Sequence, residues 1–175
     1  LLINTDSGGA ALALNSLLNL DRLGYAHVIV VGYDAKACET LAEAVRRLPQ
    51  RLARSLASTP CLRDSWWERH SSARKRFAVT RRQGAWMVRW AVLARLVRLG
   101  YNVLSFDTDG AALDDLYPHL HSAALCGRFS LMYASDYERL SPWLQTGFAY
   151  ACGARRDGAA AWVVAEVVDR YLRFA

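Results

Sequence analysis

The chain has 175 residues, of which 53% are hydrophobic and 22% are charged. This composition is typical of one globular domain and excludes an intrinsically disordered chain. The formal net charge of +6 favours an anionic partner, which could be a nucleotide, a nucleic acid or an acidic membrane surface. No run of about 18 apolar residues occurs, so we expect no membrane span within this chain.

The beginning of the chain alternates short apolar runs with helical patterns. We predict strands over residues 1–4 and 27–32, and helices over residues 10–23 and 35–48. Gly24 ends the first helix, and Asp34 is the candidate cap of the second. Apolar strands that alternate with helices indicate an α/β fold with a parallel sheet covered on both faces.

Residues 50–82 form a polar and basic stretch whose secondary structure the sequence does not indicate. Its second part, residues 66–82, carries six basic side chains against one acid. We interpret it as a long connection or the flank of an active site. The alternative is a nucleic-acid-binding segment, in which Trp66, Trp67 and Phe77 would stack on bases.

The second half returns to regular patterns. A strong helix is predicted over residues 83–99, ended by Gly100, and a strand over 101–106. The remaining predicted elements are possible strands near 122–126 and 129–134, a strand over 145–150 and a helix over 158–174.

Two carboxylates follow the predicted strand at 101–106. Asp107 and Asp109 are two residues apart, and side chains at positions i and i+2 of an extended chain point to the same side. Ligands of open α/β sheets bind at the carboxyl edge of the strands, where both acids would lie. Paired oxygen ligands suit Mn²⁺ or Mg²⁺, which can bridge a diphosphate. The alternative is a turn with two solvated acids.

The Asp-Thr-Asp-Gly stretch also resembles the Asp-x-Asp-Gly-Thr motif of haloacid-dehalogenase-type phosphatases, in which the first aspartate is the nucleophile. In this sequence Ala111 takes the position of the threonine, and no lysine follows Lys75. The motif lies past the middle of the chain, whereas in those phosphatases it normally opens the domain. These departures count against a phosphatase.

One arginine lies on the apolar side of the predicted helix at 83–99. At about 100° per residue, Arg89 falls between two apolar stripes of that helix. The stripes consist of Trp86, Trp90, Leu93 and Val97, and of Val88, Val92, Leu96 and Leu99. A buried guanidinium needs an anionic partner. That partner is either an aspartate at the sheet end, in a structural ion pair, or a donor nucleotide and the metal-site acids.

Several short motifs follow one another along the chain. They read GYNVLSFDTD at residues 100–109, LDDLYP at 113–118 and QTGF at 145–148. The chain opens with a short strand, a helix containing Asn15 and an apolar run that ends at Asp34. In this order the motifs resemble the nucleotide-diphospho-sugar transferase family of plants and algae, in which they read GYNVLxxDxD, LxDxY/FP and NTGF. The resemblance spreads over nearly all of the chain.

The resemblance implies a GT-A-type, Rossmann-like sandwich with a mostly parallel central sheet flanked by helices, in a single domain over residues 1–175. It implies transfer of a pentose or galactose from a UDP-sugar donor to a glycan or glycoprotein acceptor, with retention of configuration. The implied cofactor is Mn²⁺ or Mg²⁺. The full-length form is expected in the Golgi lumen as a type II membrane protein, and no nucleic-acid partner is expected.

Residue roles follow from the same resemblance. Asp107 and Asp109 match the metal-binding pair. The donor-binding residues would be Thr5, Asp6, Asp34, Arg89, Asp107 and Thr108. The sugar or acceptor side would be lined by Gln145, Thr146 and Gly147. No catalytic residue is assigned.

The sequence also departs from the family pattern. Gly110-Ala111-Ala112 replaces an apolar, often tryptophan-containing run, and Gln145 replaces the usual asparagine. The family continues with an Asp-Gln segment and a late histidine that can complete the metal site. We therefore expect an excised or C-terminally incomplete domain. The alternative function is a non-catalytic module that binds a nucleotide sugar.

The remaining candidate ligands receive no site from the sequence. The four cysteines, Cys38, Cys61, Cys126 and Cys152, form no CxxC motif. We expect buried thiols, although a luminal protein could pair some of them. His119 and His121 follow Pro118, and we expect them on the surface of a loop.

Overall fold

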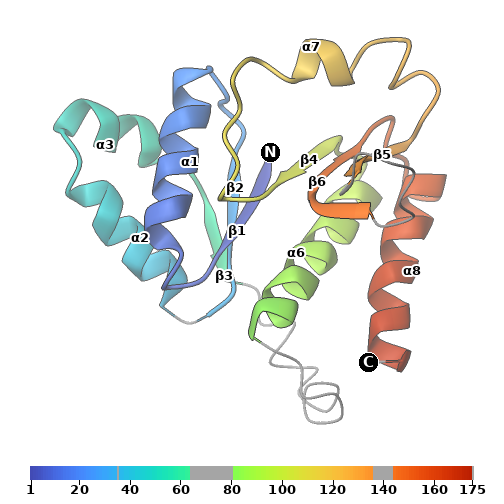
Figure 1. Cartoon of the computed structure of the whole chain (residues 1–175), viewed down its shortest axis with the longest axis horizontal. Coiled ribbons are helices and arrows are strands. Elements are labelled where there is room, and N and C mark those ends of the chain that lie inside the picture. The colour runs from blue at the N-terminus through green and yellow to red at the C-terminus, as the bar shows by residue number, and fades with distance from the viewer. Residues whose placement is uncertain (35, 64–80, 136–143, 175) are drawn as a thin grey trace.

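The computed structural model describes residues 1–34, 36–63, 81–135 and 144–174, which form one six-stranded sheet with helices on both faces (Figure 1). The elements are β1 (Leu2–Thr5), α1 (Ala10–Arg22), β2 (Ile29–Gly32), α2 (Ala37–Arg46), α3 (Gln50–Leu56), β3 (Cys61–Arg63), α6 (Arg81–Arg98), β4 (Val103–Phe106), α7 (Tyr117–Leu120), β5 (Leu131–Ser135), β6 (Leu144–Ala151) and α8 (Ala159–Phe174). No described helix is long and apolar enough to cross a membrane.

The strand order of the sheet is β3-β2-β1-β4-β6-β5. Strands β1 to β4 are parallel, whereas β6 pairs antiparallel with both β4 and β5. The predicted α/β fold with a mostly parallel central sheet flanked by helices is confirmed at this level. The sheet is nevertheless mixed, because the strand predicted at 145–150 runs against its neighbours.

Each central strand is buried on both sides. In β1, Leu2 packs in the core beneath α6 and α8, whereas Ile3 packs in the core beneath α1 and α2. In β4, Val103 and Leu104 divide between the same two cores. Side chains alternate along a strand, so a strand covered on both faces reads as a continuous apolar run. Figure 1 shows α1, α2 and α3 on one side of the sheet and α6 and α8 on the other.

Two of the predicted helix ends depend on glycine. Gly24 and Gly100 follow α1 and α6 with φ of 81° and 89°. Only glycine adopts this backbone conformation at no steric cost, which is why both helices stop where the sequence indicated.

The region after β4 differs from the prediction. The helix α7 begins at Tyr117, where the sequence indicated a loop, and Pro118 lies in its first turn. The possible strand near 122–126 is wrong, because these residues form turns. Within the polar stretch 50–82, the structure places α3 and β3, and residues 64–80 lie outside the described part.

Candidate functional site

The sheet has a topological switch point between β1 and β4. The chain passes from β1 to β2 and β3 on one side, and then places β4 on the other side of β1. In open α/β sheets, ligands bind beyond the carboxyl ends of the strands at such a point. We call the residues Asn4, Thr5, Asp6, Arg89, Asp107, Thr108 and Asp109 the switch-point site, because they follow β1 and β4 there or contact those that do.

The acid pair lies in a tight turn directly after β4. The backbone N–H of Gly110 donates to the carbonyl of Asp107 at 3.1 Å, which closes the turn. The expectation that the pair continues an extended strand is therefore wrong. The chain turns because aspartate and glycine favour the first and last positions of such a turn. Asp109 is exposed, whereas one-third of the Asp107 side chain is exposed (33%).

Arg89 is the buried partner of Asp107. Its side chain is 1% exposed, and Nη1 forms an ion pair with Oδ1 of Asp107. The same nitrogen donates to Oδ1 of Asn4 at 3.2 Å, so the guanidinium joins β1 to the turn after β4. Arg89 is buried on an apolar helix face, as the sequence predicted, and its ion pair with Asp107 is compatible with both interpretations, because Asp107 is a sheet-end aspartate and also one of the proposed metal-site acids.

Helix α1 holds the same turn from the other face of the sheet. The Ser16 hydroxyl donates to the carbonyl of Thr108 at 2.7 Å. The Asn19 side chain donates to the carbonyl of Ala112 and accepts from its N–H, both at 2.9 Å. The sequence analysis missed Ser16 and Asn19 and singled out Asn15, which is exposed. The available signal was their spacing of three residues, which places them on one helix face.

The ends of β1 and β2 are tied together by Asp34. Its Oδ2 accepts from the N–H of Ser7 at 3.0 Å and from the Ser7 hydroxyl at 2.9 Å. Its Oδ1 accepts from the N–H of Lys36, but α2 has Lys36 as its N-cap, so the predicted capping role of Asp34 is wrong. Asp6 accepts from the N–H of Gly9 at 2.7 Å, and Thr5 is buried.

The start of β6 lies at the same edge of the sheet, because this strand is antiparallel. The N–H of Asp107 donates to the carbonyl of Gly147 at 2.8 Å. The structure therefore brings Gly147 next to the acid pair. Gln145 and Thr146 precede it in β6, and their side chains lie outside the described part.

Three carboxylates belong to the switch-point site, and a fourth follows the neighbouring strand. Asp6, Asp107 and Asp109 follow β1 and β4, Asp34 follows β2, and Arg89 forms an ion pair with Asp107. Carboxylate oxygens are the ligands that a hard divalent cation prefers. Among the described residues, no third histidine, cysteine or acid joins Asp107 and Asp109 in a group of metal ligands. Two carboxylates are enough when substrate phosphates and water supply the other ligands of Mg²⁺.

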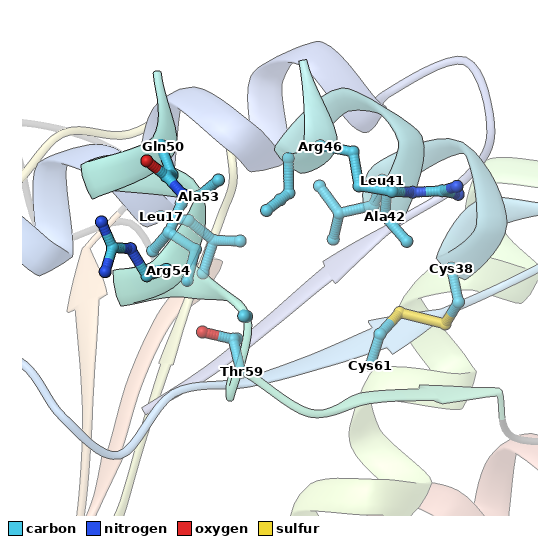
Figure 2. A pocket seen from close by; sticks show the side chains of 13 residues that line it. Leu17, Cys38, Leu41, Ala42, Arg46, Gln50, Ala53, Arg54, Thr59 and Cys61 are labelled. Atoms are coloured by element: carbon cyan, nitrogen blue, oxygen red, sulfur yellow. A yellow bond between two sulfur atoms is a disulfide. The ribbon is translucent and has the colours of Figure 1, made fainter. Parts of the chain in front are cut away.

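A cavity lies elsewhere, between α2 and α3 (Figure 2). Its volume is about 460 Å³. We call it the α2–α3 cavity. The residues that line it are Leu17, Cys38, Leu41, Ala42, Val45, Arg46, Gln50, Ala53, Arg54, Leu56, Ala57, Thr59 and Cys61. None of these residues belongs to the switch-point site, and Arg46 and Arg54 point away from each other in Figure 2.

All four cysteines form disulfides, Cys38 with Cys61 and Cys126 with Cys152. The expectation of buried free thiols is wrong, because the fold brings each pair to a Cα–Cα distance of 5.6 Å. His119 and His121 are exposed, as expected from the sequence. Comparison of the chain with protein-family models, with curated proteins and with solved structures found no match in any of the three.

Proposed function

We propose that this chain is the nucleotide-binding domain of a metal-dependent glycosyltransferase with a GT-A-type fold. The donor is a UDP-sugar that carries a pentose or galactose, the acceptor is a glycan or glycoprotein, and the anomeric configuration is retained. The proposal joins the resemblance of the sequence motifs to the position of the acid pair in the fold.

The observation that carries the proposal is the way Asp107 is held at the switch point. Its backbone is bonded to Gly147, and its Oδ1 is paired with the buried Arg89. A surface turn would not require a charge buried beneath it, because burying a guanidinium is costly unless an acid compensates it. One-third of the Asp107 side chain stays exposed despite this ion pair, and Asp109 is exposed.

The donor set fits Mn²⁺ or Mg²⁺. Asp107 and Asp109 would hold the ion, which would neutralise the charge that develops on a diphosphate leaving group. The ends of β1 and β2 would receive the nucleoside, with Thr5, Asp6 and Asp34 as its neighbours. Thr108 would lie beside the diphosphate, and Gln145, Thr146 and Gly147 on the sugar or acceptor side. Arg89 would act through Asp107 rather than touch the donor.

One further feature agrees with a location in the secretory pathway. Structural disulfides form in oxidising compartments, and this chain contains two. The Golgi lumen is such a compartment, and it is where the resemblance places the full-length protein. The pairing of the cysteines supports this location independently of the acid pair.

Calorimetric titration of UDP tests the proposed function. The purified chain is titrated in Mn²⁺ and again in EDTA, and the Asp109→Ala variant is titrated in Mn²⁺. Asp109 is exposed, so its removal should leave the fold intact. We expect binding only with the metal, and a loss of affinity of about 10-fold or more in the variant, since the metal contact is worth several kcal/mol.

Asp157 supplies the matched control. It is also an exposed aspartate, but it follows the antiparallel strand β6 and therefore lies at the opposite edge of the sheet. Asp157→Ala should bind UDP like the unmodified chain. Equal affinity in Mn²⁺ and EDTA, or equal losses in the two variants, would reject the acid pair as a donor site. If UDP instead binds only with the metal, a screen of UDP-pentoses and UDP-galactose follows.

A further inference from the structure

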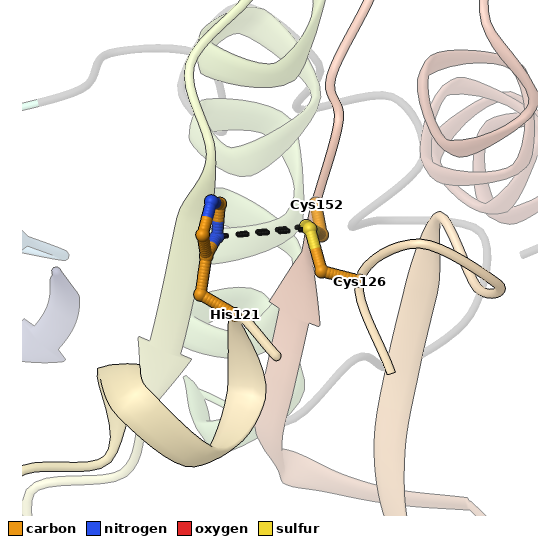
Figure 3. Close-up of side chains that lie close together, drawn as sticks. All are labelled: His121, Cys126 and Cys152. Atoms are coloured by element: carbon orange, nitrogen blue, oxygen red, sulfur yellow. Dashed lines mark hydrogen bonds between the residues drawn. A yellow bond between two sulfur atoms is a disulfide. The ribbon is translucent and has the colours of Figure 1, made fainter. Parts of the chain in front are cut away.

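A second group of potential metal ligands consists of one histidine and the two cysteines of one disulfide (Figure 3). His121 follows α7, Cys126 lies in the turns after it, and Cys152 follows β6. Their ligand atoms all lie within 4.8 Å of one another. This is the only such group of three or more histidine, cysteine or acidic side chains in the parts of the chain that the structure describes.

The distances from the histidine match those of a tetrahedral zinc site. Nδ1 of His121 lies 3.6 Å from Sγ of Cys126 and 3.8 Å from Sγ of Cys152. With zinc bonds of about 2.3 Å to sulfur and about 2.05 Å to nitrogen, a tetrahedral angle separates nitrogen from sulfur by about 3.6 Å. The imidazole is therefore already placed as a ligand, and only the two sulfur atoms would have to move apart.

The hydroxyl of Tyr150 lies beside the same ring nitrogen of His121. It is 2.9 Å from Nδ1. Because an imidazole nitrogen has one lone pair, a zinc ion at Nδ1 would replace this contact with Tyr150.

The backbone on each side of the group is shaped by glycine. Gly127 directly follows Cys126, and a Cβ there would lie 2.6 Å from the carbonyl oxygen of Ala123. Gly153 directly follows Cys152 and has φ of 59°, in the left-handed region. Cys126 and Cys152 also line a cavity of about 330 Å³.

The other disulfide lacks these features. Cys38 lies in α2 and Cys61 in β3, and no histidine or acid joins them in a group of ligands among the described residues. The two pairs have the same Cα–Cα distance of 5.6 Å. The chain thus contains an internal control in which the same bond has no third ligand beside it.

We propose that reduction of the Cys126–Cys152 disulfide creates a zinc site made of His121, Cys126 and Cys152, with water or an exogenous ligand in the fourth position. Two thiolates and one imidazole suit Zn²⁺, and three protein ligands leave the open position found in catalytic zinc centres. The site is separate from the switch-point site, so it neither requires nor tests the glycosyltransferase function.

The two states differ by a balanced reaction. A dithiol reductant transfers two electrons and two protons to the Cys126–Cys152 bond, which becomes two thiols while the reductant becomes a disulfide. Binding of Zn²⁺ then displaces one proton from each thiol. Oxidation reverses the sequence and releases the ion, so the disulfide and the zinc site exclude each other.

Metal titration of the chain with Cys38→Ser and Cys61→Ser tests the proposal, because Cys126 and Cys152 are then the only thiols. The protein is reduced with a phosphine, which binds zinc weakly, and titrated with Co²⁺ and then Zn²⁺. We expect one equivalent of Co²⁺ with the visible bands of tetrahedral coordination and the near-ultraviolet bands of thiolate ligation, displaced by Zn²⁺. The oxidised protein should show neither the tetrahedral nor the thiolate bands.

Two variants make the result specific. Adding His121→Gln should weaken Zn²⁺ binding by about 10-fold or more and change the Co²⁺ bands. The complementary chain with Cys126→Ser and Cys152→Ser, which keeps Cys38 and Cys61, should bind no tetrahedral Co²⁺. Unchanged affinity without His121, or equal binding by the complementary chain, would overturn the proposal. If circular dichroism shows that the chain with Cys38→Ser and Cys61→Ser is unfolded, the reduced unmodified chain is titrated instead. His121→Gln should then remove one equivalent of bound Zn²⁺.

Discussion

The switch-point site and the α2–α3 cavity differ in their chemistry. At the first, Asp107, Asn4 and the buried Arg89 are joined by hydrogen bonds and an ion pair. At the second, apolar side chains such as Leu41 and Leu56 surround a space of about 460 Å³. The switch-point site follows β1 and β4, at the edge where ligands of open α/β sheets bind.

The difference teaches that the two regions are held together by different forces. An apolar cavity between two short helices arises when their side chains do not fill the space, and it costs stability without needing a ligand. A buried charge, by contrast, must be held in place by specific partners. Variants can therefore separate a region held by charge from a region held by packing.

The largest effect is expected at Arg89. Replacement of Arg89 by methionine, which has a similar length, should lower the free energy of unfolding by about 3 to 5 kcal/mol, because Asp107 loses its buried partner. Urea denaturation followed by circular dichroism measures the loss. UDP binding in Mn²⁺ should also weaken, since Arg89 holds the Asp107 carboxylate.

Arg98 is the control for this variant, because it lies in the same helix α6 and is exposed. Arg98→Met should change the free energy of unfolding by less than about 0.5 kcal/mol. If the two methionine variants were equally stable, the ion pair with Asp107 would contribute nothing to the fold, and the distinction between the two regions would fail.

The next effect concerns the disulfide in the cavity wall. Cys38 and Cys61 are 23 residues apart, and closing a loop of that length stabilises the folded state by about 3 kcal/mol in the chain-entropy model. Replacing both by serine should cause a loss of that size in urea denaturation, with UDP affinity unchanged. A drop in UDP affinity as large as that of Arg89→Met would show that the cavity and the switch-point site are coupled.

A smaller loss in the free energy of unfolding is expected when a side chain that lines the cavity is shortened. Leu41 is 4% exposed and lines the α2–α3 cavity, so Leu41→Ala removes packing beside a space that already exists. We expect a loss of about 2 to 3 kcal/mol, at the low end for such substitutions, because part of the side chain has no neighbour. Thermal unfolding with and without UDP measures both properties. A variant that unfolds earlier but keeps its UDP-induced shift fits the comparison, and one that loses this shift contradicts it.

The sequence predicts the fold well where one physical rule dominates. The strands around Ile3, Val30 and Leu104 are apolar because both of their faces are covered, and Gly24 and Gly100 end their helices through a conformation that other residues avoid. The antiparallel direction of β6 was not predictable, because the direction of a strand depends on the path of the chain before it. Helix α7 was missed because four residues give no periodic signal.

The candidate site was predictable only in part for a related reason. The apolar helix face indicated that Arg89 is buried, but its choice of Asp107 and Asn4 depends on how α6 crosses β1 and β4. The disulfides show the same limit, since Cys126 and Cys152 are 26 residues apart and meet only because β6 ends beside the turns after α7. Local patterns identify which residues are unusual, whereas tertiary structure decides what they contact.

The smallest expected effect is a loss of stability at alkaline pH. It concerns the packed side of α6 rather than the switch-point site or the α2–α3 cavity. Burial raises the pKa of Tyr133 to about 12, and its ring lies 5.8 Å from that of Trp90. In the unfolded chain the pKa is about 10, so the unfolded state loses this proton first as the pH rises. The contribution of Tyr133 is therefore complete below pH of about 10 and is lost progressively up to about 12. Thermal unfolding between these pH values should show a shallower decline for Tyr133→Phe than for the unmodified chain, and parallel declines would assign the alkaline loss to other tyrosines.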